Sequence, residues 1–184
     1  MWLVCGLGNP GDKYKNTRHN VGFNIIDSIV KKNKIALYKK DKNKELFKGI
    51  LDGYKCLFCK PLTYMNLSGN PILEISNFFK IPNSNIIIIH DDLDLNLGKI
   101  KVKIGGGNGG HNGLVNIDNM IGNKYKRLRL GISHPGNKDL VESYVLNKFS
   151  KDEKKMIEIK IKLITQYFSL LFEDENLFLT RTII

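Results

Sequence analysis

Apolar and polar residues follow one another along this chain in blocks that predict alternating strands and helices. Residues 2–7 are apolar and predict a buried strand, and the continuous β-branched run 86–89 predicts a central strand covered on both faces. Apolar residues recur at helical spacing in 21–30, 72–81 and 151–172. This alternation predicts an α/β fold: a single three-layer domain with a twisted mixed, largely parallel sheet flanked by helices.

Shorter elements fill the intervals between these segments. The stretch 35–63 predicts two or three short strands, with a hairpin turn at Asp52 and Gly53. Three more elements are expected: a strand at 98–104, a helix at 112–121 and a strand at 126–132. No repeat, linker or low-complexity segment interrupts the pattern, so residues 1–184 are expected to form one domain.

Polar residues indicate where two of the helices begin. Ser68 or Asn70 is the expected N-cap of the helix around Pro71. Ser150 and Glu153 form a capping-box pattern that opens the C-terminal amphipathic helix, 151–172. The apolar positions expected along that helix include Met156, Ile159, Leu163, Tyr167 and Leu170.

Composition adds a class of partner to this picture. A net charge of +11 and a pI near 9.5 favour a polyanion, because each neutralised phosphate releases condensed counterions, although a lysine-rich proteome would give the same charge. No apolar run approaches the ~20 residues that cross a bilayer, and no export signal precedes the first strand. Three cysteines fit a reducing compartment. We therefore expect a cytoplasmic protein without a membrane segment.

The first glycine-rich loop, 6–11, matches the G-x-G-x-x-G pattern of dinucleotide-binding proteins, but its context argues against that function. Pro10 lies inside the motif, and the polar or bulky residues 12–18 precede any helical periodicity. The nearest acid at a suitable distance, Asp27, lies inside the first helix. We interpret the segment as a loop that presents three side chains: Asn9, Tyr14 and His19.

His19 is a candidate general base. With Thr17 as N-cap, it would lie in the first turn of a helix, where the helix dipole disfavours the imidazolium and keeps the ring neutral. A neutral imidazole can accept a proton near pH 7. The alternative is a surface histidine beside a helix cap.

The acidic cluster 90–94 follows the central strand, where ligands bind in open α/β sheets. Asp91 and Asp92 should point to opposite faces, and one of them could orient a histidine by accepting its Nδ1–H. A turn whose carboxylates cap backbone amides is one alternative, and a divalent-metal site is another. The chain offers no second carboxylate cluster to complete such a metal site. His90 is as well explained as a semi-buried histidine with satisfied hydrogen bonds.

The second glycine-rich loop has five glycines in the six residues 105–110, so backbone must bend sharply or approach something closely there. Lys101 and Lys103 precede the loop and a helix follows it, so its free amides could meet phosphate. A flexible hairpin is the alternative, which the adjoining His111 and Asn112 make less favourable.

Asn66, beside Met65 and ahead of a helix, offers a donor and an acceptor that suit a peptide-like amide, or it caps the helix. Cys56 and Cys59 form a CxxC pattern, but residues three apart on a strand face opposite ways, which disfavours a zinc or redox site. His134 is expected to be a turn residue.

Four segments together closely resemble the bacterial-type peptidyl-tRNA hydrolase family. In order, they are "GLGNPGDKYKNTRHNVGF" at 6–23, "KPLTYMNLSG" at 60–69, "HDDLDLNLGKIKVKIGGGNGGHNGL" at 90–114 and "YKRLRLGISHPG" at 125–136. The resemblance covers about residues 2–149, and the helix 151–172 matches by pattern rather than by letters. Asn108 departs from the family, in which many members carry a small residue or histidine there; this should affect loop detail, not chemistry.

The resemblance implies an enzyme that hydrolyses the ester joining a peptide to the 3′ ribose of tRNA, which recycles tRNA and supports translation. It implies no metal and no organic cofactor. The partner would be the acceptor end and 3′ terminus of peptidyl-tRNA, bound by a monomer whose cleft lies under a mobile lid at 137–149.

The resemblance also implies roles for individual residues. His19 would be the catalytic base that activates water, and Asp91 would orient and polarise it. Asn9, in the catalytic set, would share with Asn66 and Asn112 the tasks of holding the peptide backbone, positioning water and stabilising charge on the carbonyl oxygen. The other expected substrate contacts are Tyr14 and Met65 in the cleft, His111 beside it, and Lys103 and Arg129 at the tRNA 5′-phosphate.

Two other functions stay open at this point. One is an RNA-binding module without catalysis, since plant splicing factors resemble this fold; the intact set of His19, Asp91 and asparagines argues against it. The other is a nucleotide-dependent oxidoreductase, which depends on the first glycine-rich loop alone.

Overall fold

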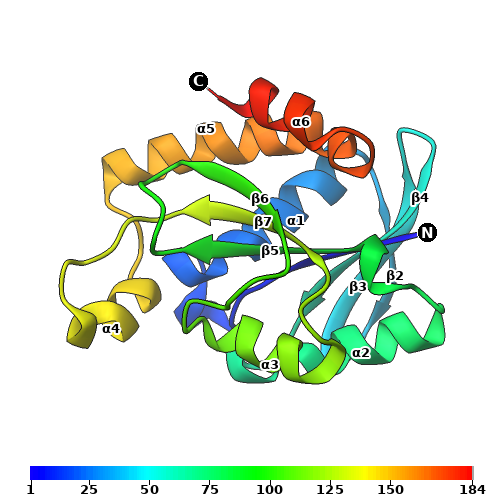
Figure 1. Cartoon of the computed structure of the whole chain (residues 1–184), viewed down its shortest axis with the longest axis horizontal. Coiled ribbons are helices and arrows are strands. Elements are labelled where there is room, and N and C mark those ends of the chain that lie inside the picture. The colour runs from blue at the N-terminus through cyan, green and yellow to red at the C-terminus, as the bar shows by residue number, and fades with distance from the viewer. Residues whose placement is uncertain (184) are drawn as a thin grey trace.

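A seven-stranded sheet runs through the centre of the molecule (Figure 1). The structure is a computed structural model that describes residues 1–183. Along the chain the strands are β1 (Trp2–Gly6), β2 (Ala36–Lys40), β3 (Lys44–Leu51), β4 (Tyr54–Pro61), β5 (Ile86–Asp92), β6 (Ile100–Ile104) and β7 (Lys126–Gly131). In space their order is β2-β3-β4-β1-β5-β7-β6.

The centre of the sheet is parallel and its edges are antiparallel. Strands β4, β1, β5 and β7 pair in parallel, so their carboxyl ends meet at one edge of the sheet. Strands β3 and β6 pair antiparallel to β4 and β7, and β2 pairs antiparallel to β3. The predicted mixed sheet is confirmed, including the hairpin turn at Asp52 and Gly53, both of which have positive φ.

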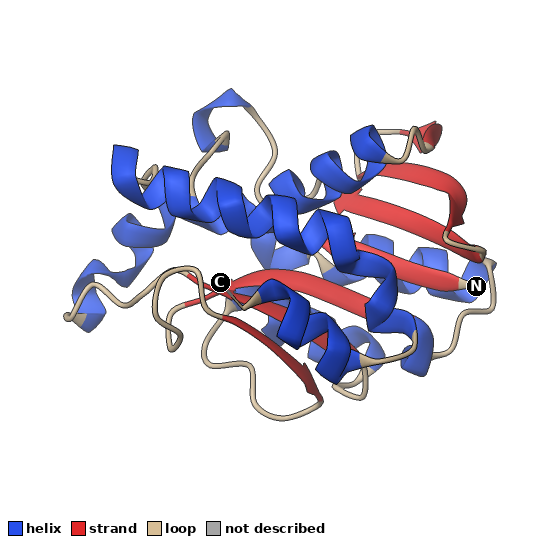
Figure 2. Cartoon of the chain, turned by 90° about the horizontal axis from the view of Figure 1, so that it is seen from above, coloured by secondary structure: helices blue, strands red, loops and turns tan. Residues whose placement is uncertain are grey.

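Helices cover both faces of the sheet. Helices α1 (Val21–Lys32), α5 (Lys151–Tyr167) and α6 (Glu175–Thr182) cover one face, and α2 (Gly69–Phe78) and α3 (Asn112–Ile121) cover the other. Figure 2 looks from the α5 side and shows helices lying across the strands. None of the helices in residues 1–183 is both long and apolar enough to cross a membrane.

The continuous apolar run in β5 has a simple cause. Ile87 and Ile89 enter the core beneath α1 and α5, whereas Ile86 and Ile88 enter the core beneath α2 and α3. Successive side chains of a strand alternate between faces, so a strand buried on both faces needs apolar residues throughout. The predicted three-layer architecture is therefore confirmed.

Ser68 is the N-cap residue of α2, as predicted, but the expected side-chain cap is absent. The Ser68 hydroxyl donates to the carbonyl of Met65 at 2.8 Å. The amide of Gly69 instead donates to Asn116 Oδ1 in α3 at 2.7 Å. The partner that satisfies this end of α2 is 47 residues away in sequence, so no local pattern could reveal it.

The capping box of Ser150 and Glu153 is confirmed, but the expected apolar face of the last helix was partly wrong. Met156 and Ile159 are 45% and 55% exposed. The buried positions lie one residue further round the helix: Ile157, Ile164, Phe168 and Leu171. Both rows have helical spacing, and packing against the sheet decides between them. The chain then tightens into a 3-10 helix, Phe168–Phe172, and continues into α6, which the sequence analysis did not predict.

The start of α1 packs directly on backbone, which leads to a stability prediction. A Cβ added to Gly22 would lie 2.4 Å from the amide nitrogen of Leu7 and 2.5 Å from the carbonyl oxygen of Ile89. Backbone atoms cannot move away without a large energetic cost, so we expect Gly22→Ala to lower the free energy of unfolding by about 1–3 kcal/mol or more. Urea denaturation measures this change. Gly107→Ala is the control, because a Cβ there meets nothing within 4 Å; an unchanged midpoint for Gly22→Ala would contradict the close packing.

Candidate active site

A cleft of about 1010 Å³ opens at the carboxyl ends of β1 and β5. Asn9 follows β1, and the acidic residues of β5 line the cleft floor. Three other segments contribute to its lining: the turn after β4, the second glycine-rich loop, and the short helix α4 (Val141–Leu146). The cleft therefore lies where the sequence predicted ligand binding, beyond the parallel strands.

His19 lies in a 3-10 helix, Arg18–Asn20, that precedes α1. Thr17 is its N-cap residue and His19 lies in its first turn, as predicted, but the Thr17 hydroxyl donates to the carbonyl of Tyr14 at 2.8 Å and caps no amide. The helix is also a single 3-10 turn rather than the start of an α-helix. The helix dipole does not determine the charge of this ring, and its other neighbours do.

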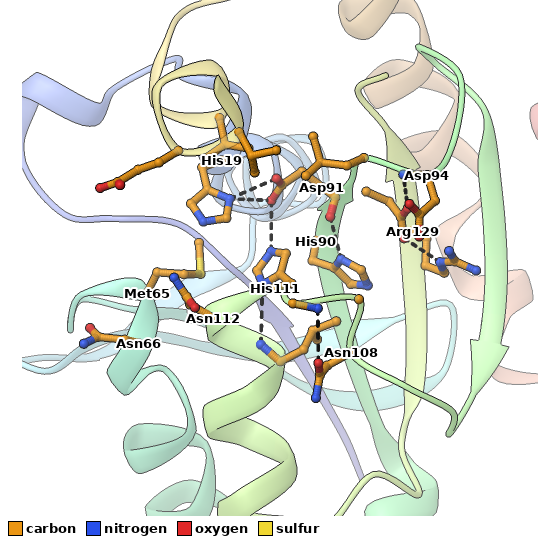
Figure 3. A pocket seen from close by; sticks show the side chains of 18 of the residues that line it. His19, Met65, Asn66, His90, Asp91, Asp94, Asn108, His111, Asn112 and Arg129 are labelled. Atoms are coloured by element: carbon orange, nitrogen blue, oxygen red, sulfur yellow. Dashed lines mark hydrogen bonds and ion pairs between the residues drawn. The ribbon is translucent and has the colours of Figure 1, made fainter. Parts of the chain in front are cut away.

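The main neighbour of His19 is Asp91. His19 Nδ1 lies 2.9 Å from both carboxylate oxygens of Asp91, which is 2% exposed (Figure 3). Burial favours the neutral ring, but the negative charge of Asp91 and the hydrogen bond outweigh it, so the pKa of His19 is raised above its usual value. The expected direction of the shift was wrong. His19 Nε2 has no hydrogen-bond partner among the described residues, and the ring lines the cleft.

His111 is the second partner of Asp91. Its Nδ1 accepts hydrogen bonds from the amides of Gly113 and Leu114, at 3.2 and 3.4 Å, so its Nε2 carries the proton and donates to Asp91 Oδ1 at 3.1 Å. His111 thus caps α3 through Nδ1 and holds the carboxylate of Asp91 through Nε2. Burial raises the pKa of Asp91, but the two histidines and their hydrogen bonds outweigh it and hold that pKa well below its usual range.

His90 lies beneath this pair. Its Nδ1–H donates to the carbonyl of Asp91 at 2.7 Å, and the residue is 2% exposed. Burial, followed by repulsion from His111, lowers the pKa of His90 to about 3. His90 is therefore neutral, more deeply buried than expected, and satisfied at one ring nitrogen among the described residues.

Asn9 is fixed by the backbone around it. Its Oδ1 accepts the amide proton of Met65 at 2.8 Å, which leaves Nδ2 to donate into the cleft. The side chain of Asn20 bonds both the amide and the carbonyl of Asn9, at 2.9 and 2.8 Å. This positioning role of Asn20 was not predicted, because an asparagine next to a histidine carries no signal for it.

The other predicted substrate residues lie at several places around the cleft. Met65, Asn66 and Asn112 line it, and Figure 3 shows them grouped beside His111. Tyr14 is not among the lining residues: it packs edge-on against Tyr64, with ring centroids 6.4 Å apart. Tyr64 lines the cleft here, and a substrate contact of Tyr14 stays a prediction. Tyr64 is 59% exposed and was missed because it stands in a short turn without periodicity.

The basic end of the cleft contains Lys103 and Arg129. Arg129 Nε donates to Asp92 Oδ2 at 2.7 Å. Asp91 therefore bonds the two histidines and Asp92 bonds Arg129, as the alternation of side chains along the strand predicted. The terminal nitrogens of Arg129 and the exposed ammonium of Lys103 are placed to meet an anion.

Arg127 holds the second glycine-rich loop in place. It is 2% exposed as a side chain and donates to the carbonyl of Gly107 at 2.8 Å and to Asp118 Oδ1 at 3.0 Å. Asn108 contacts Asp118 and accepts from the amide of Gly110. These bonds oppose the interpretation of the loop as a merely flexible hairpin. This role of Arg127 was not predicted, because an arginine on a predicted strand carries no signal for it.

One group of three possible metal ligands occurs among residues 1–183. It consists of His19, Asp91 and His111, whose ligand atoms lie within 4.8 Å of one another. The same atoms form the hydrogen bonds given above. Cys56 and Cys59 enter opposite cores, which confirms that they face opposite ways.

A histidine oriented by a buried carboxylate, with amide groups around it at the ends of parallel strands, defines a hydrolase built on an α/β domain. The sequence profile of the family described as peptidyl-tRNA hydrolase matches residues 3–181. The chain therefore belongs to the peptidyl-tRNA hydrolase family.

Individual relatives agree with this assignment. Peptidyl-tRNA hydrolases of Rickettsia bellii (strain RML369-C) and Rickettsia conorii (strain Malish 7) are 48% and 49% identical over 176 residues, which is 95% of each chain. The crystal structure of peptidyl-tRNA hydrolase from Acinetobacter baumannii superposes with a TM-score of 0.93 at 38% identity, covering 99% of this chain and 94% of that one.

Proposed function

We propose that this chain hydrolyses the ester bond between the peptide and the 3′ ribose of peptidyl-tRNA, and so returns free tRNA to translation. The observation that carries this proposal is the pair of His19 and Asp91. The carboxylate holds the Nδ1–H of the ring and leaves Nε2, on the cleft side, to accept a proton. Family membership over residues 3–181 supplies the substrate class.

His19 and Asp91 carry the proton transfers. His19 Nε2 takes a proton from water, and the resulting hydroxide attacks the ester carbonyl carbon. Asp91 stays ionised and stabilises the imidazolium that forms. When the tetrahedral intermediate collapses, the bond from carbon to the ribose 3′ oxygen breaks, and His19 returns its proton to that oxygen. The peptide is released as an acid that loses its proton to solvent, so the products are a peptide carboxylate, a proton and tRNA.

The amide side chains recognise the peptide and the developing charge. Asn9 Nδ2 is a donor fixed in direction by the amide of Met65, which suits it to the carbonyl oxygen as negative charge develops there. Asn66 and Asn112 are exposed on the same side and bind the peptide backbone. A site built to pair with a peptide amide discriminates strongly against an ester that lacks one.

The basic end binds the tRNA. Lys103 and Arg129 neutralise phosphate at the acceptor end, and the net charge of +11 supports the rest of the contact. The chain acts as a cytoplasmic monomer of one domain. Segment 137–149 includes α4, which brings Val141 and Glu142 to the cleft and acts as its lid.

The release of an N-acetylated amino acid from its tRNA, measured with EDTA present, tests this proposal. We expect turnover by the wild-type protein, because the proton transfers use side chains of the chain itself. An inactive protein that still bound tRNA would indicate an RNA-binding module. Measurable NADH binding would favour the oxidoreductase.

A further inference from the structure

Arg18, the residue before His19, lies against the end of α4. Its Nη1 donates to the carbonyls of Tyr144, Asn147 and Lys148, at 3.2, 3.3 and 3.1 Å. The residue is 7% exposed, although nothing in the chemistry above uses it. A buried guanidinium with three backbone acceptors in one short segment indicates that the segment depends on it.

Arg18 makes three further contacts, two with the segment at the end of α4 and one with α5. Arg18 stacks on the ring of Tyr144, 4.1 Å from its centroid, and its Nη2 pairs with Glu153 Oε2 at 2.8 Å. Glu153 is also the residue that closes the capping box of α5. The backbone amide of Arg18 donates to the carbonyl of Asn147 at 3.1 Å, so the contact is continuous from the side chain to the main chain.

Helix α4 needs such support because it is too short to be stable alone. It has six residues and ends at Asn147 in an extended conformation, without a glycine C-cap. The last carbonyls of a helix require partners from elsewhere, and Arg18 supplies one to Tyr144 in α4 and to Asn147 and Lys148 directly after it. Helix α4 also brings Val141, Glu142 and Val145 to the lining of the cleft.

We propose that Arg18 is a positioning residue that anchors the C-terminal end of α4, the proposed lid of the cleft, beside His19. This inference rests on the proposed function for its kinetic consequences, but not for its structural ones. Removal of the guanidinium frees α4, so peptidyl-tRNA binds more weakly. The pH dependence of kcat stays in place, because Asp91 raises the pKa of His19 and the guanidinium of Arg18 bonds neither side chain.

Arg18→Met tests the proposal, because methionine keeps an unbranched apolar stem and removes every donor. We expect KM for N-acetyl-aminoacyl-tRNA to rise about tenfold or more, with a smaller fall in kcat and no shift of its pH profile. Hydrogen–deuterium exchange should become fast across 138–148 and stay slow across β5. Arg18→Lys should recover part of the KM, since an ammonium reaches a carbonyl but lacks the planar fork.

Two control variants make the test specific. Arg181→Met removes an exposed arginine from α6 and should change neither KM nor exchange. Glu153→Gln keeps the oxygen that caps α5 and the three carbonyl contacts of Arg18, so its KM should rise less than that of Arg18→Met. A wild-type KM in Arg18→Met, or exchange that accelerates equally in α4 and β5, would overturn the proposal. Because exchange needs no turnover, an inactive wild type would refute the proposed function while the role of Arg18 was still measured.

Discussion

His19→Ala should lose about 10²–10⁴-fold in the rate of ester hydrolysis while it keeps its affinity for tRNA. The side chain supplies a ring nitrogen, Nε2, that has no hydrogen-bond partner among the described residues while Asp91 holds Nδ1, and it contributes no cation to the basic end. Single-turnover release of an N-acetylated amino acid measures the first quantity, and filter binding of the tRNA measures the second.

The variant must also be shown to fold. His19 is 9% exposed and donates to Asp91, so its removal leaves a buried carboxylate with one partner fewer. His111 still donates to that carboxylate, and we expect thermal unfolding to remain cooperative. Loss of tRNA binding together with turnover, in a folded variant, would count against a purely catalytic role for His19.

The sequence predicted the layers of this fold because they follow from local periodicity. The run 86–89 indicated a doubly buried strand, and α3 begins and ends where the predicted helix 112–121 does. The predictions were wrong where a residue distant in sequence determines the local structure. Asn116 satisfies the start of α2, and packing on the sheet selects which apolar row of α5 is buried.

In the candidate site, too, local patterns could be predicted and contacts between distant residues could not. Asn9, His19 and Asp91 could be found because polar residues after predicted strands gather at one edge of a parallel sheet. The direction of the His19 pKa shift could not be predicted, because it depends on a carboxylate 72 residues away. Arg18 acts on carbonyls more than 120 residues distant, and backbone carbonyls leave no trace in a sequence.

Asp91→Asn should lower the hydrolysis rate by about 10²–10⁴-fold. An asparagine presents an N–H where one carboxylate oxygen now lies 2.9 Å from His19 Nδ1. Two donors cannot face each other, so the ring turns or changes tautomer, and Nε2 no longer accepts the proton of water. Steady-state kinetics on the same tRNA substrate measures the loss.

The pH profile distinguishes loss of the charge from loss of geometry. In the wild type, the rate falls as the pH drops through the pKa of His19, which Asp91 raises above its usual value. Without that charge, burial alone acts on the ring and lowers its pKa, so the acid limb of Asp91→Asn should move to lower pH. Asp92→Asn is the matched control, since that carboxylate pairs with Arg129: it should alter KM and leave the acid limb in place. An acid limb that stayed at the wild-type pH in Asp91→Asn would show that another group sets the charge of His19.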